Sequence, residues 1–220
     1  MNWKLPNQLT VGRIGLAAAF FVLLGLYEPG TRLGCWLLNA AFVVYIVAGI
    51  TDVLDGWIAR KYNLTSAFGR IVDPFVDKVL VVGAFVMLAG ANFSVAQRPE
   101  LMGGFERGLP GWLLGGMASA VQAWMVVAIM AREFIVSAVR GYSESQGIKF
   151  PATPAGKIKM FVQSVAICTV LFQLANAPQA TWAVVTKIAT VWLSVAVTVL
   201  SGASYINKAK GLLVTKDERA

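Results

Sequence analysis

Four aspartates form two closely spaced pairs within a largely apolar stretch of the sequence. Asp52 and Asp55 are three residues apart, and Asp73 and Asp77 are four residues apart. Residues at these spacings lie on the same face of a helix, with Cβ atoms about 5–6 Å apart, so each pair places two carboxylates side by side. A carboxylate at bilayer depth costs roughly 2.5–3.5 kcal/mol when nothing compensates it, so the cluster requires cations.

Carboxylate oxygens are the ligands that hard divalent cations prefer, and Mg²⁺ is typically held by a few carboxylates together with substrate phosphates. Two acidic pairs facing each other across a short loop would suit two ions, Mg²⁺ or Mn²⁺, held by Asp52, Asp55, Asp73 and Asp77. Two metal ions about 4 Å apart favour an in-line displacement at phosphorus. The pattern therefore predicts metal-dependent phosphoryl-group transfer at a membrane surface.

The composition indicates that the elements carrying these aspartates span a membrane. The chain is 57% hydrophobic and 14% charged, with a mean hydropathy of +0.67. Six apolar runs each approach the roughly 17–20 residues of a spanning helix once their flanks are counted. They are Val11–Tyr27, Leu33–Ile50, Ile71–Ala91, Ala118–Ile135 (continuing to Val139), Phe161–Ala175 and Thr181–Tyr205. We expect an all-α integral membrane protein, one domain over residues 1–220, with six transmembrane helices and a short N-terminal interfacial segment. The second and third helices would continue into the aspartate segments.

The distribution of Lys and Arg predicts the orientation. If the N-terminus is cytoplasmic, the other side holds only Arg32, Arg98, Arg107 and Lys187, and the remaining fifteen of the nineteen cations are cytoplasmic. This asymmetry follows the positive-inside rule and places the aspartates at the cytoplasmic face of the cytoplasmic membrane. The net charge of +8 is explained by attraction to anionic lipid headgroups, and we expect no nucleic-acid partner. Residues 92–116 read as an external loop.

Two absences narrow the chemistry. The sequence contains no histidine, so a general base must be Asp, Glu, Lys or Tyr. The two cysteines, Cys35 and Cys168, are far apart and lie in apolar runs, so neither a thiol metal site nor a disulfide framework is indicated.

The aspartates belong to a longer pattern, D-x2-D-G-x2-A-R-x8-G-x3-D-x3-D, which begins at Asp52 and ends at Asp77. It resembles the signature of the CDP-alcohol phosphatidyltransferases, with all eight fixed positions present. Chance agreement at eight positions is on the order of 1 in 10⁹ per starting point. The resemblance implies that the hydroxyl of an alcohol attacks the lipid-side phosphorus of CDP-diacylglycerol and expels CMP. It also implies a homodimer.

The same resemblance implies roles for the motif residues. Asp52, Asp55 and Asp73 would bind the metal ions that bridge the pyrophosphate. Asp77 would accept the alcohol proton and could also contact the second metal ion. The nucleotide would lie against Asp52, Gly56, Ala59, Arg60 and Gly69.

Cations outside the motif suggest where the acceptor alcohol binds. Arg132 and Arg140, eight residues apart and about 80° apart round a helix, lie toward one side of it. Together with Lys78, Lys157 and Lys159 they could bind the phosphate of a phosphorylated alcohol. Alternatively, these side chains extend to lipid headgroups. Glu133 would either pair with a neighbouring cation or help to hold the acceptor.

Three segments resemble those members of the family that use sn-glycerol 3-phosphate as acceptor. They are Leu5–Arg13, Ala131–Arg140 and Gly156–Gln163. Met160 and Gly141 depart from this subgroup, which usually has Thr at the first position and a polar residue at the second. In the N-terminal segment, Thr10 and Arg13 could cap the first helix or reach into the site.

Two other functions remain open from the sequence. The same chemistry could serve another acceptor, namely inositol phosphate, serine or a lipid, although the basic residues argue against serine. Alternatively, the aspartates could be the ion site of an Mg²⁺ transporter. A transporter is expected to place acidic residues near the bilayer centre and often contains internal repeats, whereas these aspartates cluster at one face and no repeat is visible.

Overall fold

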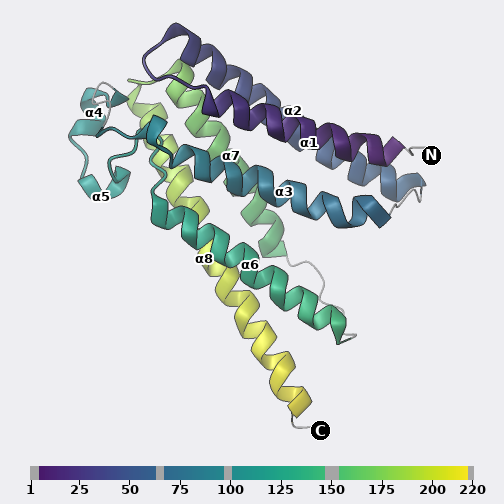
Figure 1. Cartoon of the computed structure of the whole chain (residues 1–220). Coiled ribbons are helices and arrows are strands. Elements are labelled where there is room, and N and C mark those ends of the chain that lie inside the picture. The colour runs from purple at the N-terminus through teal and green to yellow at the C-terminus, as the bar shows by residue number, and fades with distance from the viewer. Residues whose placement is uncertain (1–4, 63–66, 97–100, 147–153, 218–220) are drawn as a thin grey trace.

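The computed structural model describes residues 5–62, 67–96, 101–146 and 154–217, and within these ranges the chain is helical and contains no β-strand (Figure 1). Each expected apolar run falls largely within one long helix. These helices are α1 (Leu5–Gly25), α2 (Arg32–Tyr62), α3 (Ala67–Leu88), α6 (Ala123–Ser145), α7 (Pro154–Asn176) and α8 (Thr181–Asp217). Three short helices lie between α3 and α6, namely η1 (Ala91–Phe93), α4 (Gly104–Arg107) and α5 (Gly111–Leu114).

Within the described ranges, three segments are long and apolar enough to cross a bilayer: Arg32–Leu54 in α2, Gly156–Asn176 in α7 and Thr181–Tyr205 in α8. The apolar part of α1, Val11–Gly25, is shorter. The chain is therefore a multi-pass helical membrane protein. That all six long helices cross the membrane stays a prediction.

The long helices share one hydrophobic core. Helix α1 packs against α2 and α3, α7 packs against α2 and α8, and α6 packs against α8 and α3. The fully buried rings of Phe20 and Phe85 lie in this core, and the Phe20 ring centroid is 5.4 Å from that of Tyr45. Helices α1 and α3 approach closely at Gly83, where a Cβ atom would lie only 2.5 Å from the ring of Phe21. This packing fixes α3 beside α1 and so positions the second pair of aspartates.

The fourth apolar run begins differently from the prediction, because residues 118–122 are not helical and α6 starts at Ala123. The hydroxyl of Ser119 donates to the carbonyl of Leu88 at 2.7 Å, and the Ala118 amide donates to the Phe93 carbonyl at 2.8 Å. Ala120 has a φ of +59°, in the left-handed region. These contacts hold the segment against the end of α3. Helix α8 also differs, since it continues twelve residues past the predicted end at Tyr205.

The predicted external loop folds back onto α8 through a buried ion pair. Lys187 is fully buried, and its Nζ lies 2.7 Å from Glu106 Oε1 and donates to the carbonyl of Ala118 at 2.6 Å. The other carboxylate oxygen of Glu106 accepts from the Gly103 amide at 3.0 Å. The sequence placed Lys187 at the external side but did not identify its partner. The pair joins α4, the segment before α6 and α8 at the end of the bundle away from the aspartates (Figure 1).

We expect the Glu106→Gln substitution to destabilise the protein without touching the aspartate segments. Removing one partner of a buried ion pair costs about 3–5 kcal/mol, because the remaining charge is left uncompensated in a medium of low dielectric constant. For a chain of this length the thermal midpoint in detergent should fall by roughly 10 °C. Glu28→Gln, an exposed carboxylate between α1 and α2, is the matched control and should leave the midpoint unchanged. Equal midpoints for the two variants would contradict the assigned role of the pair.

Candidate active site

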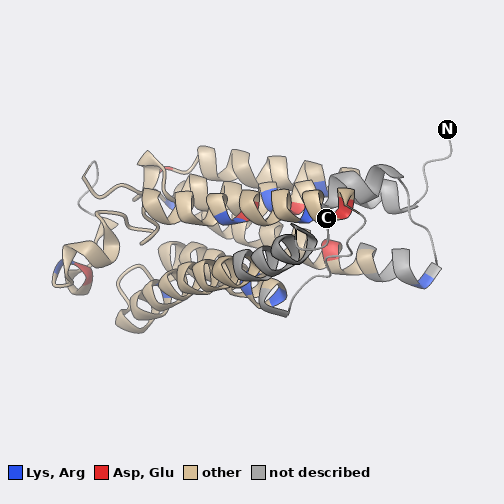
Figure 2. Ribbon diagram, turned by 90° about the horizontal axis from the view of Figure 1, so that it is seen from below, with Lys and Arg blue, Asp and Glu red and all other residues tan. Residues whose placement is uncertain are grey.

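The aspartate motif lies on two helices that meet at the end of the bundle opposite α4 and α5 (Figure 1). Asp52 and Asp55 belong to α2, and Asp73 and Asp77 belong to α3. Each pair therefore has the helical spacing that the sequence predicted. Most charged positions lie in this half of the molecule, away from α4 (Figure 2). Several predicted site residues have side chains outside the described part of the structure, namely Thr10, Asp55, Ala59, Arg60 and Asp73, and the surroundings of Gly69 are outside it too.

Asp52 is held by a cation from α1. Nη1 of Arg13 lies 2.5 Å from Oδ1 of Asp52, and the Arg13 side chain is only 1% exposed, whereas that of Asp52 is 39% exposed. Helix α1 begins at Leu5, so Thr10 and Arg13 lie inside the helix and neither caps it. Of the two alternatives, capping the helix and reaching into the site, the structure therefore supports the second for Arg13. A buried guanidinium beside the carboxylate orients it, as outer residues commonly orient the ligands of metal sites.

Asp77, the last aspartate of the motif, lies near both Asp52 and a group of cations. The charged groups that act on its carboxylate are Asp52, Arg13, Lys159 and Glu133, the strongest named first. The Asp52 and Asp77 carboxylates repel each other although they belong to different helices, so one acidic site can include both. Their only donor atoms are hard oxygens, and the neighbouring Arg13 would fix one of them. This donor set fits a divalent ion such as Mg²⁺ or Mn²⁺ better than a softer metal.

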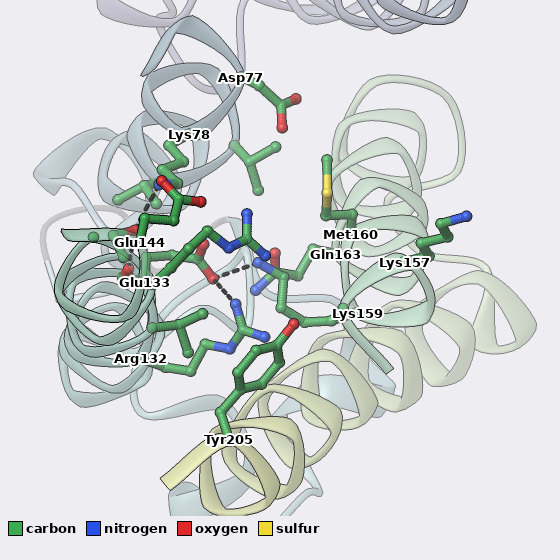
Figure 3. A pocket seen from close by; sticks show the side chains of 17 residues that line it. Asp77, Lys78, Arg132, Glu133, Glu144, Lys157, Lys159, Met160, Gln163 and Tyr205 are labelled. Carbon is green, nitrogen blue, oxygen red and sulfur yellow. Dashed lines mark hydrogen bonds and ion pairs between the residues drawn. The ribbon is translucent and has the colours of Figure 1, made fainter. Parts of the chain in front are cut away.

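A cavity of about 620 Å³ opens beside Asp77, between α3, α6, α7 and α8 (Figure 3). All five cations that the sequence proposed for the acceptor line it: Lys78, Arg132, Arg140, Lys157 and Lys159. The carboxylates on its wall are Asp77, Glu133 and Glu144. Five cations and three carboxylates leave two net positive charges, which matches the charge of a phosphate monoester dianion.

Glu133 organises two of these cations. Its Oε1 accepts a hydrogen bond from Nη1 of Arg132 at 2.9 Å and also forms a short ion pair with Nζ of Lys159, as the dashed lines in Figure 3 show. Arg132 and Lys159 are both buried, at 8% and 4% exposed, so extension to lipid headgroups does not account for them. Lys78 donates to the hydroxyl of Ser137 at 2.6 Å. Of the two alternatives for Glu133, the structure therefore has it paired with cations.

Helix α8 contributes contacts that the sequence did not indicate. The Tyr205 ring lies 5.4 Å from the guanidinium carbon of Arg132, and the Ser201 hydroxyl accepts from Arg132 Nε at 3.2 Å. Gly202 lies between them, and a Cβ atom there would approach Cγ of Arg132 to 3.1 Å. In the sequence, only the four-residue spacing of Ser201 and Tyr205 could have indicated that both face the same neighbour. Such a spacing is inconspicuous within an apolar run.

Two residues that differ from the family members using sn-glycerol 3-phosphate line this cavity. Met160 is an exposed α7 residue beside Lys159, and Gly141 follows Arg140 on α6. Neither residue takes part in the Glu133 ion pairs. They alter the wall of the cavity and leave its charged groups in place.

Comparisons with known proteins identify the family of this chain. The family model described as CDP-alcohol phosphatidyltransferase matches residues 3–200. A Bacillus subtilis (strain 168) protein named CDP-diacylglycerol–glycerol-3-phosphate 3-phosphatidyltransferase is 31% identical over 94% of this chain and 95% of its own length. An Arabidopsis thaliana protein named CDP-diacylglycerol–glycerol-3-phosphate 3-phosphatidyltransferase 1, chloroplastic/mitochondrial, is 32% identical over 93% of this chain and 62% of its own length. A rice (Oryza sativa subsp. japonica) protein named cardiolipin synthase (CMP-forming) is 32% identical over 93% of this chain and 56% of its own length.

Proposed function

The chain belongs to the CDP-alcohol phosphatidyltransferase family, and we propose that it is a phosphatidylglycerophosphate synthase. It transfers the phosphatidyl group from CDP-diacylglycerol to sn-glycerol 3-phosphate and releases CMP. The observation that carries this proposal is the cavity beside Asp77, whose two net positive charges complement the phosphate of the acceptor. The names of the Bacillus subtilis and Arabidopsis relatives agree with this acceptor.

The family uses divalent metal ions. Two ions, Mg²⁺ or Mn²⁺, bound by Asp52, Asp55, Asp73 and Asp77 would neutralise charge on the pyrophosphate and on departing CMP. Arg13 keeps the Asp52 carboxylate turned toward the site. The family pattern assigns the nucleotide to Asp52, Gly56, Ala59, Arg60 and Gly69, where the small residues leave room for the cytidine.

Asp77 is the proposed general base. It belongs to the motif and lines the cavity, so it can face the reacting hydroxyl of an alcohol whose phosphate lies among the cations. The acceptor oxygen forms its bond to the lipid-side phosphorus as Asp77 takes the proton, and the bond from that phosphorus to CMP breaks. Because aspartate is a weak base, proton transfer accompanies bond formation and does not precede it.

The acceptor phosphate binds to Lys78, Arg132, Arg140, Lys157 and Lys159. Glu133 holds Arg132 and Lys159 in place, so these cations are positioned before the acceptor arrives. Pre-positioned charges lose less conformational entropy on binding, which favours affinity.

One other acceptor is favoured by a specific observation. The rice relative is named cardiolipin synthase (CMP-forming), so a lipid alcohol is the second candidate. Inositol phosphate carries the same phosphate dianion as sn-glycerol 3-phosphate, whereas serine carries no phosphate to match the two positive charges. The transporter alternative is dropped, because the family is one of transferases.

The proposed location and orientation of the enzyme in the membrane follow from its apolar runs and the distribution of its cations. We propose a single membrane domain over residues 1–220, with six spans in the cytoplasmic membrane and the active site open to the cytoplasm. This orientation puts the site on the side of nucleotide-activated substrates and agrees with the positive-inside rule. A homodimer is part of the proposal through the family resemblance.

Product identification tests this function. Purified protein is incubated with CDP-diacylglycerol, Mg²⁺ and isotope-labelled sn-glycerol 3-phosphate, and the lipid extract is analysed by mass spectrometry. We expect labelled phosphatidylglycerol phosphate, and none when EDTA is present. A lipid product formed equally well without sn-glycerol 3-phosphate would contradict the proposed acceptor.

A further inference from the structure

Gln163 lies on the wall of the proposed acceptor cavity but takes no part in its ion pairs. It is on α7, four residues after Lys159 and therefore on the same face of the helix, and it is fully buried. Figure 3 shows it on the α7 side of the cavity near Lys159. Its amide nitrogen Nε2 donates to the hydroxyl oxygen of Thr198 on α8 at 2.9 Å.

The hydrogen bonds of Thr198 fix the orientation of this amide. The Thr198 hydroxyl donates its own proton to the carbonyl of Ser194 at 2.6 Å, so it can only accept from Gln163. The NH₂ group of Gln163 must therefore face Thr198, and the amide oxygen must point elsewhere. That oxygen, Oε1, is buried and has no hydrogen-bond partner among the residues that the structure describes. A buried acceptor without a donor is costly and rare, and on the wall of a cavity a bound ligand can supply that donor.

Arg140, on the wall of the same cavity, has an unsatisfied hydrogen-bond donor. Its Nε is buried and, within the described part of the chain, also has no hydrogen-bond partner. The wall therefore offers one buried donor and one buried acceptor, both unsatisfied, beside two net positive charges. A ligand that carries an anionic group and a hydroxyl group satisfies both atoms.

From this geometry we propose that Gln163 Oε1 accepts a hydrogen bond from the non-reacting hydroxyl of the acceptor alcohol. This inference rests on the proposed function. In sn-glycerol 3-phosphate, the cations take the phosphate and Asp77 takes the proton of the reacting primary hydroxyl. The secondary hydroxyl is then the remaining donor, and Gln163 Oε1 is a buried acceptor on the cavity wall that no described residue satisfies. Gln163 thus selects acceptors that carry a second hydroxyl between the phosphate and the reacting group.

The test compares two acceptors that differ only in this hydroxyl. Initial rates of CMP release give kcat/KM for sn-glycerol 3-phosphate and for 3-hydroxypropyl phosphate, which lacks the secondary hydroxyl. Because the analogue without this hydroxyl leaves the buried Gln163 oxygen unpaired, the wild type should prefer sn-glycerol 3-phosphate by about 10–100-fold. The Gln163→Leu variant should lose activity on sn-glycerol 3-phosphate only, so that its preference falls to about 1–3-fold.

A matched control lies on the same helix. Gln173 is likewise fully buried, and no described residue donates to its Oε1, but it is near the far end of α7 and does not line the cavity. The Gln173→Leu variant should keep the wild-type preference. A second variant, Thr198→Val, removes the contact that orients the amide and should weaken the preference while keeping Gln163.

The outcomes separate the inference from the function. Equal kcat/KM values for the two acceptors in the wild type overturn the inference and leave the proposed function standing, whether or not the Gln163 variants fold. A preference that persists unchanged in Gln163→Leu also overturns it. No CMP release with either acceptor overturns the proposed function and the inference with it.

Discussion

The Asp77→Asn variant is expected to bind CDP-diacylglycerol nearly as well as the wild type but to release CMP about 10²–10⁴-fold more slowly. An amide has nearly the size of the carboxylate but cannot take the proton of the acceptor hydroxyl, and a positioned general base contributes about 10²–10⁴-fold to rate. Among the motif carboxylates whose side chains the structure describes, Asp77 is the one that lines the cavity. The measurement combines initial rates of CMP release with binding of CDP-diacylglycerol to the purified variant.

The control for this substitution is Glu28→Gln, which makes the same chemical change at an exposed carboxylate between α1 and α2. It should turn over at the wild-type rate. Normal turnover by a folded Asp77→Asn enzyme would remove Asp77 from the role of base. Loss of CDP-diacylglycerol binding would instead assign Asp77 chiefly to substrate or metal binding.

The Asp52→Asn variant is expected to need about 10–100-fold more Mg²⁺ for half-maximal activity, and its maximal rate should also fall. The substitution removes a negatively charged oxygen ligand from the proposed metal site. It also removes the charge that Arg13 contacts at 2.5 Å. Mg²⁺ titration of CMP release measures both effects.

Arg13→Lys separates the ligand from the residue that orients it. Lysine keeps the positive charge but loses the planar guanidinium, so the Mg²⁺ requirement should rise less than in Asp52→Asn. An unchanged Mg²⁺ requirement in Asp52→Asn would show that Asp52 is not a metal ligand.

The helices were predictable because a bilayer leaves a spanning segment few alternatives to a helix, so a long apolar run predicts one directly. The continuation of α2 and α3 through the aspartates was predictable for a related reason, since the acidic pairs have helical spacing. The non-helical conformation of residues 118–122 was not predictable, because they continue an apolar run that otherwise forms a helix. Their conformation depends on the hydrogen bond from Ser119 to Leu88, thirty-one residues away in the sequence.

Some residues of the candidate site were likewise predictable from the sequence, and others were not. Asp52, Asp77 and the five cations of the cavity have residue types and spacings that indicate chemistry without any structure. The partners of buried charges do not, because they are set by packing between helices distant in the sequence. Arg13 with Asp52 and Lys187 with Glu106 are such pairs. Gln163 lies in a segment that is similar to the corresponding segment of family members. Its unsatisfied Oε1 becomes evident only from the structure, through the contact of Nε2 with Thr198.

The most direct test of the central claim is the rate of CMP release from CDP-diacylglycerol by the purified protein with Mg²⁺. Four acceptors are offered separately: sn-glycerol 3-phosphate, inositol phosphate, serine and a lipid alcohol such as phosphatidylglycerol. We predict turnover with sn-glycerol 3-phosphate alone, and its loss on addition of EDTA. Turnover with a different acceptor would keep the chemistry and refute the assignment of the cavity. Folded protein that releases no CMP with any of the four would contradict the proposed function altogether.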